Sequence, residues 1–494
     1  MRRPSSVLRA LPVRRGVAVT TARRAVRPRL AGRAAALLLP LTAAGVVVPT
    51  AGAAPRVTLD GGTVASLPVC GRTAPVHRVD TGGALRLVAP AARSRAARTA
   101  RKGSAVVVDR CENGVWKPLR TITLGARRRA LSAGIVTGTE ATGDLRVRSR
   151  TKAGRTGTPV YARIGVGEIV DVPISVKVVN QNRTAIPCLG APDGKTYTVR
   201  GSVVAPRSAL TAGNPAVSVY VHGLGYSSFF FRFGDVPGYD YGLSQARAGH
   251  ASVVLDRLGN PAHDDLPDGN ATCIPAQADM VDQVVRGLRT GRVSGIPETP
   301  RFKKVVLAGH SLGGFIAQVA QYSFGSGDAL AVIGYTDVPS GLALGTFANA
   351  GADCALNPQR SHGATGAPGY AAFGRTDADF AAGHFHDIDP VVARDVLRRH
   401  NLDPCGDLLS ALQALAVDQV ATRTSITAPV LVISGADDAL FSPPTNRIQA
   451  STAYPRSREV SSVELPDTGH AVTLGRTHEA FRRAMDRWLT DQGA

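Results

Sequence analysis

The sequence predicts an α/β fold built on a mainly parallel sheet with helices on both of its faces. Short apolar, β-branched runs alternate with longer segments in which apolar residues recur at helical spacing. Alternation of this kind favours parallel strands, because each crossover helix returns the chain to the same edge of the sheet. We expect strands at 196–204, 217–221, 251–255, 429–435 and 460–465, and helices at 244–250 and 277–289.

The strongest local pattern joins one predicted strand to a helix. An apolar run at 302–308 leads into Gly309-His310-Ser311-Leu312-Gly313, and an apolar helical pattern follows. A serine at the tip of a sharp strand-to-helix turn needs small neighbours, and the two glycines supply them. This context predicts Ser311 as a nucleophile, while the adjacent His310 is expected to pack or hydrogen-bond locally.

A nucleophilic serine needs a base and a third group that orients the base. The strand at 429–435 is followed by Asp437 and Asp438, and His470 comes after one further β-like segment. The order serine, aspartate, histidine is the one that this turn motif requires. The pattern therefore supplies a base and two candidates for the orienting carboxylate.

A second glycine-containing loop lies upstream of the serine. The buried strand at 216–221 opens into His222-Gly223-Leu224-Gly225. Such a loop can direct a backbone N–H at the negative oxygen that develops when a carbonyl is attacked. We expect the N–H groups of Leu224 and Leu312 to form this oxyanion hole, with His222 fixing the loop.

These motifs resemble the α/β-hydrolase superfamily, and more narrowly its serine esterase and lipase-like members, from about Asp171 to the C-terminus. The resemblance implies that Ser311 is the nucleophile, that His470 is general base and then acid, and that Asp438 orients the histidine. It also implies the fold, a sheet of this family with a helical lid.

The resemblance also bears on the choice of acid. The family's acid follows a glycine and two variable residues, which favours Asp438 over Asp437 when counted from Gly435. A rarer variant of the family would use Asp337, after the preceding strand. The stretch Asn260-Pro-Ala-His263 departs from the glycine and serine usual at that place in the family, which leaves the shape of one pocket wall open.

The formal net charge of +21 is unevenly distributed. Residues 1–53 hold 10 arginines and no acid, residues 54–170 hold 21 Lys and Arg against 7 Asp and Glu, and residues 171–494 hold 27 against 30. The portion that carries the motifs is therefore near neutral. The basic middle segment predicts a solvated basic surface, or alternatively attachment to an anionic cell envelope. Nucleic acid is not an expected partner.

The first 53 residues are interpreted as a secretory signal peptide. Arginines precede the apolar run 34–48, and Ala51-Gly-Ala53 supplies small residues for cleavage. The run has 15 residues interrupted by Pro40, which is short of the ~20 needed to span a bilayer. The basic part is long, which favours a start further downstream, at a codon read here as Val17 or Val19. We expect a secreted protein that does not span the membrane.

Six cysteines agree with export, because an oxidising compartment allows an even set to pair. The most local of the ~15 possible connectivities joins Cys70 to Cys111, Cys188 to Cys273, and Cys354 to Cys405. We expect neither a metal nor a cofactor. His384 and His386, which are followed by acids, are interpreted as part of a solvated loop rather than as metal ligands.

Residues 54–170 predict a small all-β, sandwich-like domain. Alternating runs at 84–89, 104–110, 119–124 and 144–149 are separated by glycine and proline turns. We expect Trp116 to be buried and the Cys70–Cys111 disulfide to join the two sheets.

A long insertion is expected inside the hydrolase-like domain of residues 171–494. Between Asp337 and Pro429 lie roughly ninety residues without an obvious strand, too many for a simple crossover. We predict a lid at about 340–427, with helices near 390–400 and 407–421.

Together these features predict a secreted serine hydrolase (carboxylesterase or lipase-like, EC 3.1.1 class) that cleaves small-molecule carboxylic esters through an acyl-enzyme. Phe229, Phe230 and Phe231 either line an apolar acyl pocket or pack under the lid. Two alternatives stay open: an exported serine peptidase of the same fold, and a cell-surface binding protein with a vestigial site. No acidic cluster that would hold a peptide amine is identifiable, and the complete motif set argues against the binding protein.

Overall fold

The computed structural model describes residues 58–60, 63–80, 85–89, 104–112, 115–123, 131–135, 143–165, 168–261, 263, 265–356, 366–418 and 425–494. The predicted signal peptide and the arginine-rich stretches at 93–102 and 127–129 lie outside these residues. Within the described ranges, no helix has both the length and the apolarity that crossing a bilayer demands.

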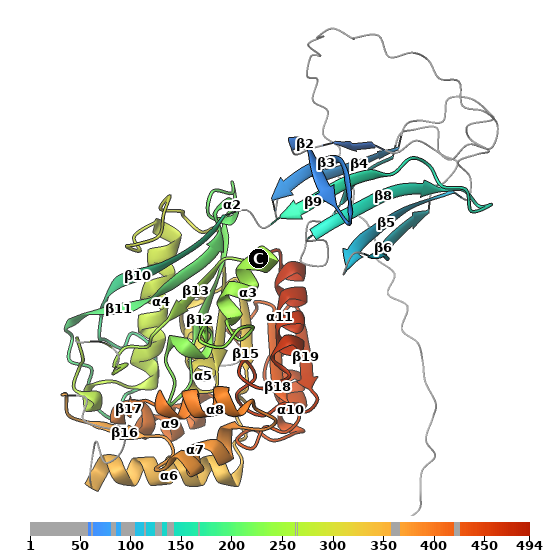
Figure 1. Ribbon diagram of the computed structural model, residues 1–494. Helices are drawn as coiled ribbons and strands as arrows, with labels where there is room; N and C mark the ends of the chain where they lie inside the picture. The colour runs from blue at the N-terminus through green and yellow to red at the C-terminus, as the bar shows by residue number, and fades with distance from the viewer. Residues whose placement is uncertain are drawn as a thin grey trace, which may run out of the picture. The chain divides into compact units, whose positions relative to one another are not determined.

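An eight-stranded sheet forms the centre of the C-terminal region (Figure 1). Its order is β10-β11-β13-β12-β14-β15-β18-β19, and every neighbouring pair from β13 to β19 is parallel. The prediction of a mainly parallel sheet is confirmed. The antiparallel pairing of β10 with β11 and of β11 with β13 was not predicted, since apolar periodicity carries no information on strand direction. The strands are β10 (Ile169–Val179), β11 (Thr196–Pro206), β12 (Ala216–Val221), β13 (Ser252–Leu255), β14 (Lys304–His310), β15 (Ala329–Ile333), β18 (Val430–Gly435) and β19 (Val460–Leu465).

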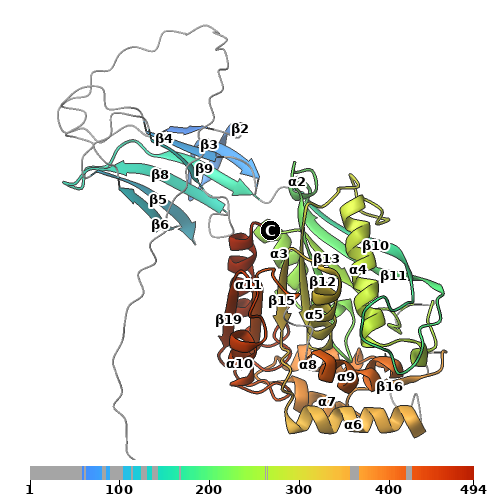
Figure 2. The same ribbon diagram turned by 180° about the vertical axis from the view of Figure 1, so that it is seen from behind.

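Helices cover both faces of this sheet (Figures 1 and 2). Alternate residues of β14 show the division, because successive side chains of a strand point to opposite faces. Val305 and Leu307 belong to the core that includes α4 and α5, whereas Val306 and Ala308 belong to the core that includes α3 and α11. The helices are α2 (Arg207–Leu210), α3 (Tyr241–Ala248), α4 (Ile274–Thr290), α5 (Leu312–Phe324), α10 (Thr445–Thr452) and α11 (His478–Gln492).

A lid of helices and one short strand pair lies between β15 and β18, at one end of the sheet (Figure 1). The predicted helices near 390–400 and 407–421 correspond to α8 and α9. Two further helices and the antiparallel pair β16–β17 were not predicted, because three-residue strands are too short to show a period. The lid elements are α6 (Gly341–Leu356), β16 (Tyr370–Ala372), α7 (Asp377–His384), α8 (Pro390–Arg398), β17 (Leu402–Pro404) and α9 (Cys405–Val417).

Every element described in residues 58–165 is a β-strand, as predicted, and these strands are divided between two sheets. One has the order β1-β4-β7 and the other the order β2-β3-β9-β8-β5-β6. The strands are β1 (Thr58–Asp60), β2 (Thr63–Val69), β3 (Arg72–Asp80), β4 (Leu85–Ala89), β5 (Ala105–Glu112), β6 (Val115–Thr123), β7 (Leu131–Ile135), β8 (Gly143–Arg150) and β9 (Val160–Gly165).

The prediction that Trp116 is buried is wrong. Trp116 is only half-buried, because β6 is an edge strand of its sheet. Its ring packs against that of Tyr161 at 5.9 Å, and the Arg146 guanidinium lies 4.9 Å from its centroid. Arg146 and Arg148 also pair with the buried Asp109 at 2.9 Å, so one carboxylate offsets half of the charge of these two basic side chains.

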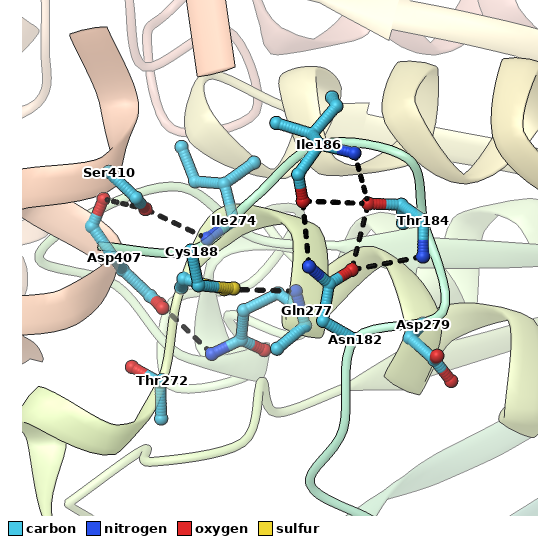
Figure 3. Close-up of a disulfide and its surroundings, with 12 residues drawn as sticks. Asn182, Thr184, Ile186, Cys188, Thr272, Ile274, Gln277, Asp279, Asp407 and Ser410 are labelled. Carbon is cyan, nitrogen blue, oxygen red and sulfur yellow. Dashed lines mark hydrogen bonds between the residues drawn. A yellow bond between two sulfur atoms is a disulfide. The ribbon is translucent and has the colours of Figure 1, made fainter. Parts of the chain in front are cut away.

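The three disulfides of the most local scheme are all present, with Cα–Cα distances of 5.7, 5.8 and 5.5 Å in chain order. The expectation that Cys70–Cys111 joins two sheets is wrong, because Cys70 lies in the turn between β2 and β3 and Cys111 lies on β5, which are strands of one sheet. Figure 3 shows the surroundings of Cys188, which is bonded to Cys273 at the start of α4. The Cys354–Cys405 bond joins the end of α6 to the first residue of α9. It therefore holds the two longest lid helices together.

Candidate active site

Ser311 occupies a strained turn between β14 and α5. Its φ of 52° is unusual for a residue with a side chain. The flanking glycines are required by close backbone approach. A Cβ on Gly309 would lie 2.0 Å from the Gly313 carbonyl oxygen, and one on Gly313 would lie 2.2 Å from the Val221 oxygen. The N–H of Ser311 donates to the Ile333 carbonyl at 2.8 Å, which ties the turn to the neighbouring strand.

His470 and Asp438 meet behind this turn, from the loops after β19 and β18. Asp438 Oδ2 lies 2.8 Å from His470 Nδ1, and Oδ1 accepts the N–H groups of Leu440 and Phe441, each at 2.9 Å. Both side chains are buried. An ionised carboxylate only accepts hydrogen bonds, so this contact holds the histidine proton on Nδ1. Nε2 is then a free acceptor, and it has no hydrogen-bond partner among the described residues.

The residue that precedes the serine packs directly on His470. His310 Nε2 donates to the His470 carbonyl at 3.0 Å, and the two ring centroids are 4.6 Å apart. Burial and the neighbouring His470 hold the pKa of His310 well below its usual range, so it is a neutral packing partner. The structure thus brings the Ser311 turn and His470 into one buried cluster.

The other two carboxylates considered from the sequence lie elsewhere. Asp437 is 41% exposed and its nearest basic partner is His386, at 3.6 Å. The backbone N–H of Asp337 donates to Gln449. Asp438 is therefore the one of the three that is paired with His470.

The glycine-containing loop after β12 passes over the serine. A Cβ on Gly223 would lie 2.8 Å from the Ser311 Cβ. His222 fixes this loop as expected: its Nδ1 donates to the Gly223 carbonyl at 2.8 Å, and its Nε2 accepts the Arg257 N–H at 3.1 Å. Burial, reinforced by the Arg257 charge, lowers the pKa of His222 to about 3, which keeps the ring neutral.

Leu312, on the other side of the serine, is the first residue of α5. The first N–H groups of a helix have no acceptor within the helix and carry its positive dipole end. The Leu312 N–H and the Leu224 loop therefore both border the serine, where a negative oxygen would develop.

A narrow apolar pocket of about 40 Å³ opens beside Ser311. None of its lining side chains is charged, and most come from α5, the lid helices α6 and α9, and the loops after β15 and β18. Leu344 of α6 and Leu412 of α9 line it while remaining 45% and 58% exposed, so they stand at its mouth. The aromatic wall consists of Phe315, Tyr335, Phe347, Phe373 and Phe441.

Phe229, Phe230 and Phe231 do not line this pocket. They are buried in the core that includes α3, α11 and the lid helices α7 and α8, where Phe230 stacks on His310 with ring centroids 3.9 Å apart. The packing interpretation of these phenylalanines is therefore the correct one. The pocket aromatics were missed because they come from five separated segments with no common local motif.

The interpretation of His384 as part of a solvated loop is wrong. His384 is buried, its Nδ1 donates to the Phe380 carbonyl at 2.9 Å, and its ring lies 5.1 Å from that of His470. Burial and the nearby His470 hold its pKa well below the usual range. The helix α7 folds it inward, whereas His386 is exposed. Among the described residues, no group of three or more His, Cys, Asp and Glu side chains is placed to hold a metal ion.

Sequence reasoning also missed a buried charge cluster around Arg257, shortly before the segment 260–263 that departs from the family pattern. Arg257 pairs with Asp403 at 2.8 Å and with Asp407 at 2.7 Å, and all three side chains are almost fully buried. Burial raises the pKa of Asp403 to about 7, although Arg257 opposes the shift. The partners are about 150 residues apart in the chain, so no local signal could have revealed the cluster.

A family model described as "Alpha/beta hydrolase family" matches residues 219–484. No curated protein matches the chain. Solved structures that are similar to it include a putative aryl esterase from Burkholderia cenocepacia, with 18% identity, 62% of this chain and 98% of that chain covered, and a TM-score of 0.40. A hydrolase from Pseudomonas aeruginosa PA01 has 16% identity, coverage of 63% and 100%, and a TM-score of 0.42. A monoacylglycerol lipase from Paleococcus ferrophilus has 18% identity, coverage of 56% and 94%, and a TM-score of 0.38.

Proposed function

Since the chain belongs to the alpha/beta hydrolase family, whose model matches residues 219–484, we propose that it is a serine hydrolase that cleaves carboxylic esters through an acyl-enzyme. One observation carries the proposal: a buried His470 is held by Asp438 on one edge, lies beside the Ser311 turn, and keeps Nε2 unpartnered among the described residues. A histidine of this kind can act as a general base and take the proton of the serine hydroxyl.

In the proposed mechanism, Ser311 Oγ attacks the ester carbonyl carbon while His470 Nε2 takes the hydroxyl proton. Asp438 stabilises the imidazolium that forms, and the N–H groups of Leu224 and Leu312 bind the oxyanion. The tetrahedral intermediate collapses, and His470 gives its proton to the departing alkoxide. Water, deprotonated by His470, then attacks the acyl-enzyme and releases the carboxylic acid and the free serine.

The pocket beside the serine supports an apolar acyl group as the part of the substrate that binds there. Its lining holds no charged side chain, and its mouth is flanked by Leu344 and Leu412. A peptide substrate would bring a charged amine or several unpaired amide groups against this surface, at a desolvation cost. This favours esters of modest acyl length over peptides.

Export and the division into domains are also part of the proposal. Three disulfides among the described residues support an oxidising compartment, and we assign residues 1–53 to a signal peptide. Residues 54–170 would form the basic β domain, for which contact with an anionic cell envelope is consistent with its excess of arginine. Residues 171–494 would form the hydrolase domain.

The test compares the protein with Ser311→Ala. Both are treated with a fluorophosphonate probe and then offered p-nitrophenyl esters of increasing chain length and aminoacyl anilides. Labelling and ester turnover by the unmodified protein alone are the expected results. Anilide cleavage without ester turnover would indicate a peptidase, and a protein that neither labels nor turns over any ester would refute the proposal and favour a binding function.

A further inference from the structure

The buried charge cluster connects the lid to the loop that passes over Ser311. Arg257 follows β13 in the hydrolase sheet, whereas Asp403 lies on β17 and Asp407 in the first turn of α9, both in the lid. The Arg257 guanidinium donates to Asp403 Oδ1 at 2.8 Å and to Asp407 Oδ2 at 2.7 Å. Three charged side chains with exposures of 3% or less are costly to bury, and a cost of this kind calls for an explanation.

Asp403 uses its second oxygen on the loop itself. Its Oδ2 accepts the Gly225 N–H at 2.7 Å, and the Asn401 N–H, also from the lid, donates to the Gly225 carbonyl at 3.0 Å. A Cβ on Gly225 would lie 2.6 Å from Phe380 and 2.8 Å from His400, so the lid packs tightly on this glycine. The lid therefore holds the peptide unit between Leu224 and Gly225 in place.

The peptide that precedes Leu224 is held from the other side. The Gly223 carbonyl, which accepts from His222 Nδ1, belongs to the same planar peptide unit as the Leu224 N–H. In a trans peptide the two groups point in opposite directions, so holding the carbonyl sets the direction of the N–H. Asp403 fixes the next peptide plane, and together the two contacts leave Leu224 little freedom in φ and ψ.

Arg257 links the two contacts. Its backbone N–H donates to His222 Nε2 at 3.1 Å, and its guanidinium holds Asp403. Asp407 completes the arrangement by accepting from Gln277 Nε2 of α4 at 2.9 Å, as Figure 3 shows. A continuous series of buried, charge-assisted hydrogen bonds thus runs from α4 through the lid to the loop. Such a network restrains the positions of the groups that it joins.

We propose that Asp403 is a positioning residue for the oxyanion hole: its carboxylate, supplied by the lid, holds Gly225 and thereby aims the Leu224 N–H at the negative oxygen. The inference rests on the proposed function at Ser311. It also means that the lid is part of the machinery that stabilises the transition state and does more than cover the pocket. Asp403 itself touches neither substrate nor the reacting atoms.

The test uses Asp403→Ala and Asp403→Asn, with Asp353→Asn as the matched control. Asp353 is also a buried lid carboxylate, and its two oxygens accept from the Arg375 guanidinium, also in the lid, at 2.7 and 2.9 Å. For each folded variant, kcat and KM are measured on a p-nitrophenyl ester, together with the inhibition constant of an alkyl trifluoromethyl ketone. The ketone forms a hemiketal with the serine and places an anionic oxygen in the hole.

For Asp403→Ala we expect kcat to fall about a hundredfold with little change in KM, as when an oxyanion donor is lost. Affinity for the trifluoromethyl ketone should fall in proportion to kcat/KM, because both report the anionic state. Asp403→Asn should lose at least about tenfold, since one amide oxygen cannot accept from both Arg257 and Gly225. The Asp353→Asn control should stay within about threefold of the unmodified protein in both measurements.

A purely structural role gives a different result, in which thermal stability falls while the kcat and ketone affinity of the folded fraction do not. Unchanged kcat and ketone affinity in folded Asp403→Ala overturn the inference. If that variant does not fold, the same result in the isosteric Asp403→Asn overturns it. An unmodified protein that neither hydrolyses esters nor binds the ketone would instead refute the proposed function.

Discussion

Replacing Asp438 with asparagine probes the proposed triad where its geometry is most constrained. Oδ1 accepts two backbone N–H groups, from Leu440 and Phe441, while Oδ2 faces His470 Nδ1. An asparagine must place its single oxygen toward the two N–H donors, because the reverse orientation would leave both unpaired at a cost of about 1–3 kcal/mol each. The amide NH₂ then faces Nδ1.

This orientation inverts the histidine tautomer. Facing a donor, Nδ1 must act as an acceptor, so the ring proton moves to Nε2, which can no longer accept the serine proton. The amide orientation that would keep the proton on Nδ1 is less stable by ~2 kcal/mol or more, so only a few per cent of molecules hold the correct tautomer. These molecules also lack the carboxylate charge that stabilises the imidazolium. We expect kcat to fall by about 10³–10⁴-fold with KM and melting temperature nearly unchanged.

The assay is steady-state hydrolysis of a p-nitrophenyl ester, normalised to folded protein by circular dichroism. Asp437→Asn and Asp337→Asn are the controls, and each should lower kcat by less than about fivefold because neither carboxylate bonds to His470. The reasoning is refuted if folded Asp438→Asn keeps more than a tenth of the activity. It is equally refuted if either control loses as much activity as Asp438→Asn.

Three further predictions concern the lid, the buried histidines and the pocket. The double variant Cys354→Ser, Cys405→Ser opens a loop with a sequence separation of 51 and should lower the free energy of unfolding by about 4 kcal/mol, measured by urea titration; an unchanged midpoint contradicts this. Because the pKa of His384 is depressed in the native state, the unfolded chain binds a proton at this histidine below about pH 6.5 while the native state does not. The free energy of unfolding therefore decreases as the pH falls below that value. In His384→Phe the dependence of unfolding free energy on pH just below pH 6.5 should therefore weaken by up to about 1.4 kcal/mol per pH unit, and an equal slope in both proteins would be evidence against a neutral His384. Phe373→Ala should enlarge the apolar pocket and shift the preferred p-nitrophenyl ester to a longer chain, whereas an unaltered chain-length profile would place the acyl group elsewhere.

Local sterics explain why much of the fold could be predicted. The Gly309-His310-Ser311-Leu312-Gly313 turn is recognisable because a side chain on Gly309 would meet the Gly313 carbonyl oxygen four residues later, whereas the requirement at Gly313 comes from Val221 of the neighbouring strand β12. Strand and helix periods likewise arise from which residues face the core, so the alternating sheet and the helices α4, α8 and α9 were predicted close to their observed bounds. The disulfide pairing stayed open among ~15 connectivities, and the structure selects the most local of them.

Contacts between distant segments were not predictable in the same way. Whether Asp438 or its neighbour faces His470 depends on the loop that Leu440 and Phe441 fold around the carboxylate. The inward rotation of His384 and the apolar wall that α6 and α9 form beside Ser311 depend on how the lid packs. None of these has a period or a spacing that a linear pattern could express.

The chain by itself therefore determined the mainly parallel α/β class, the turn 309–313 around Ser311 and the order of the candidate site residues, because each is expressed in local sequence patterns. Only the tertiary structure decided the carboxylate that holds His470, the walls of the pocket and the link from Arg257 through Asp403 to Gly225. These features depend on burial. An unpaired buried polar side chain is costly, so it bonds to whichever partner the packing brings near, at any distance along the chain.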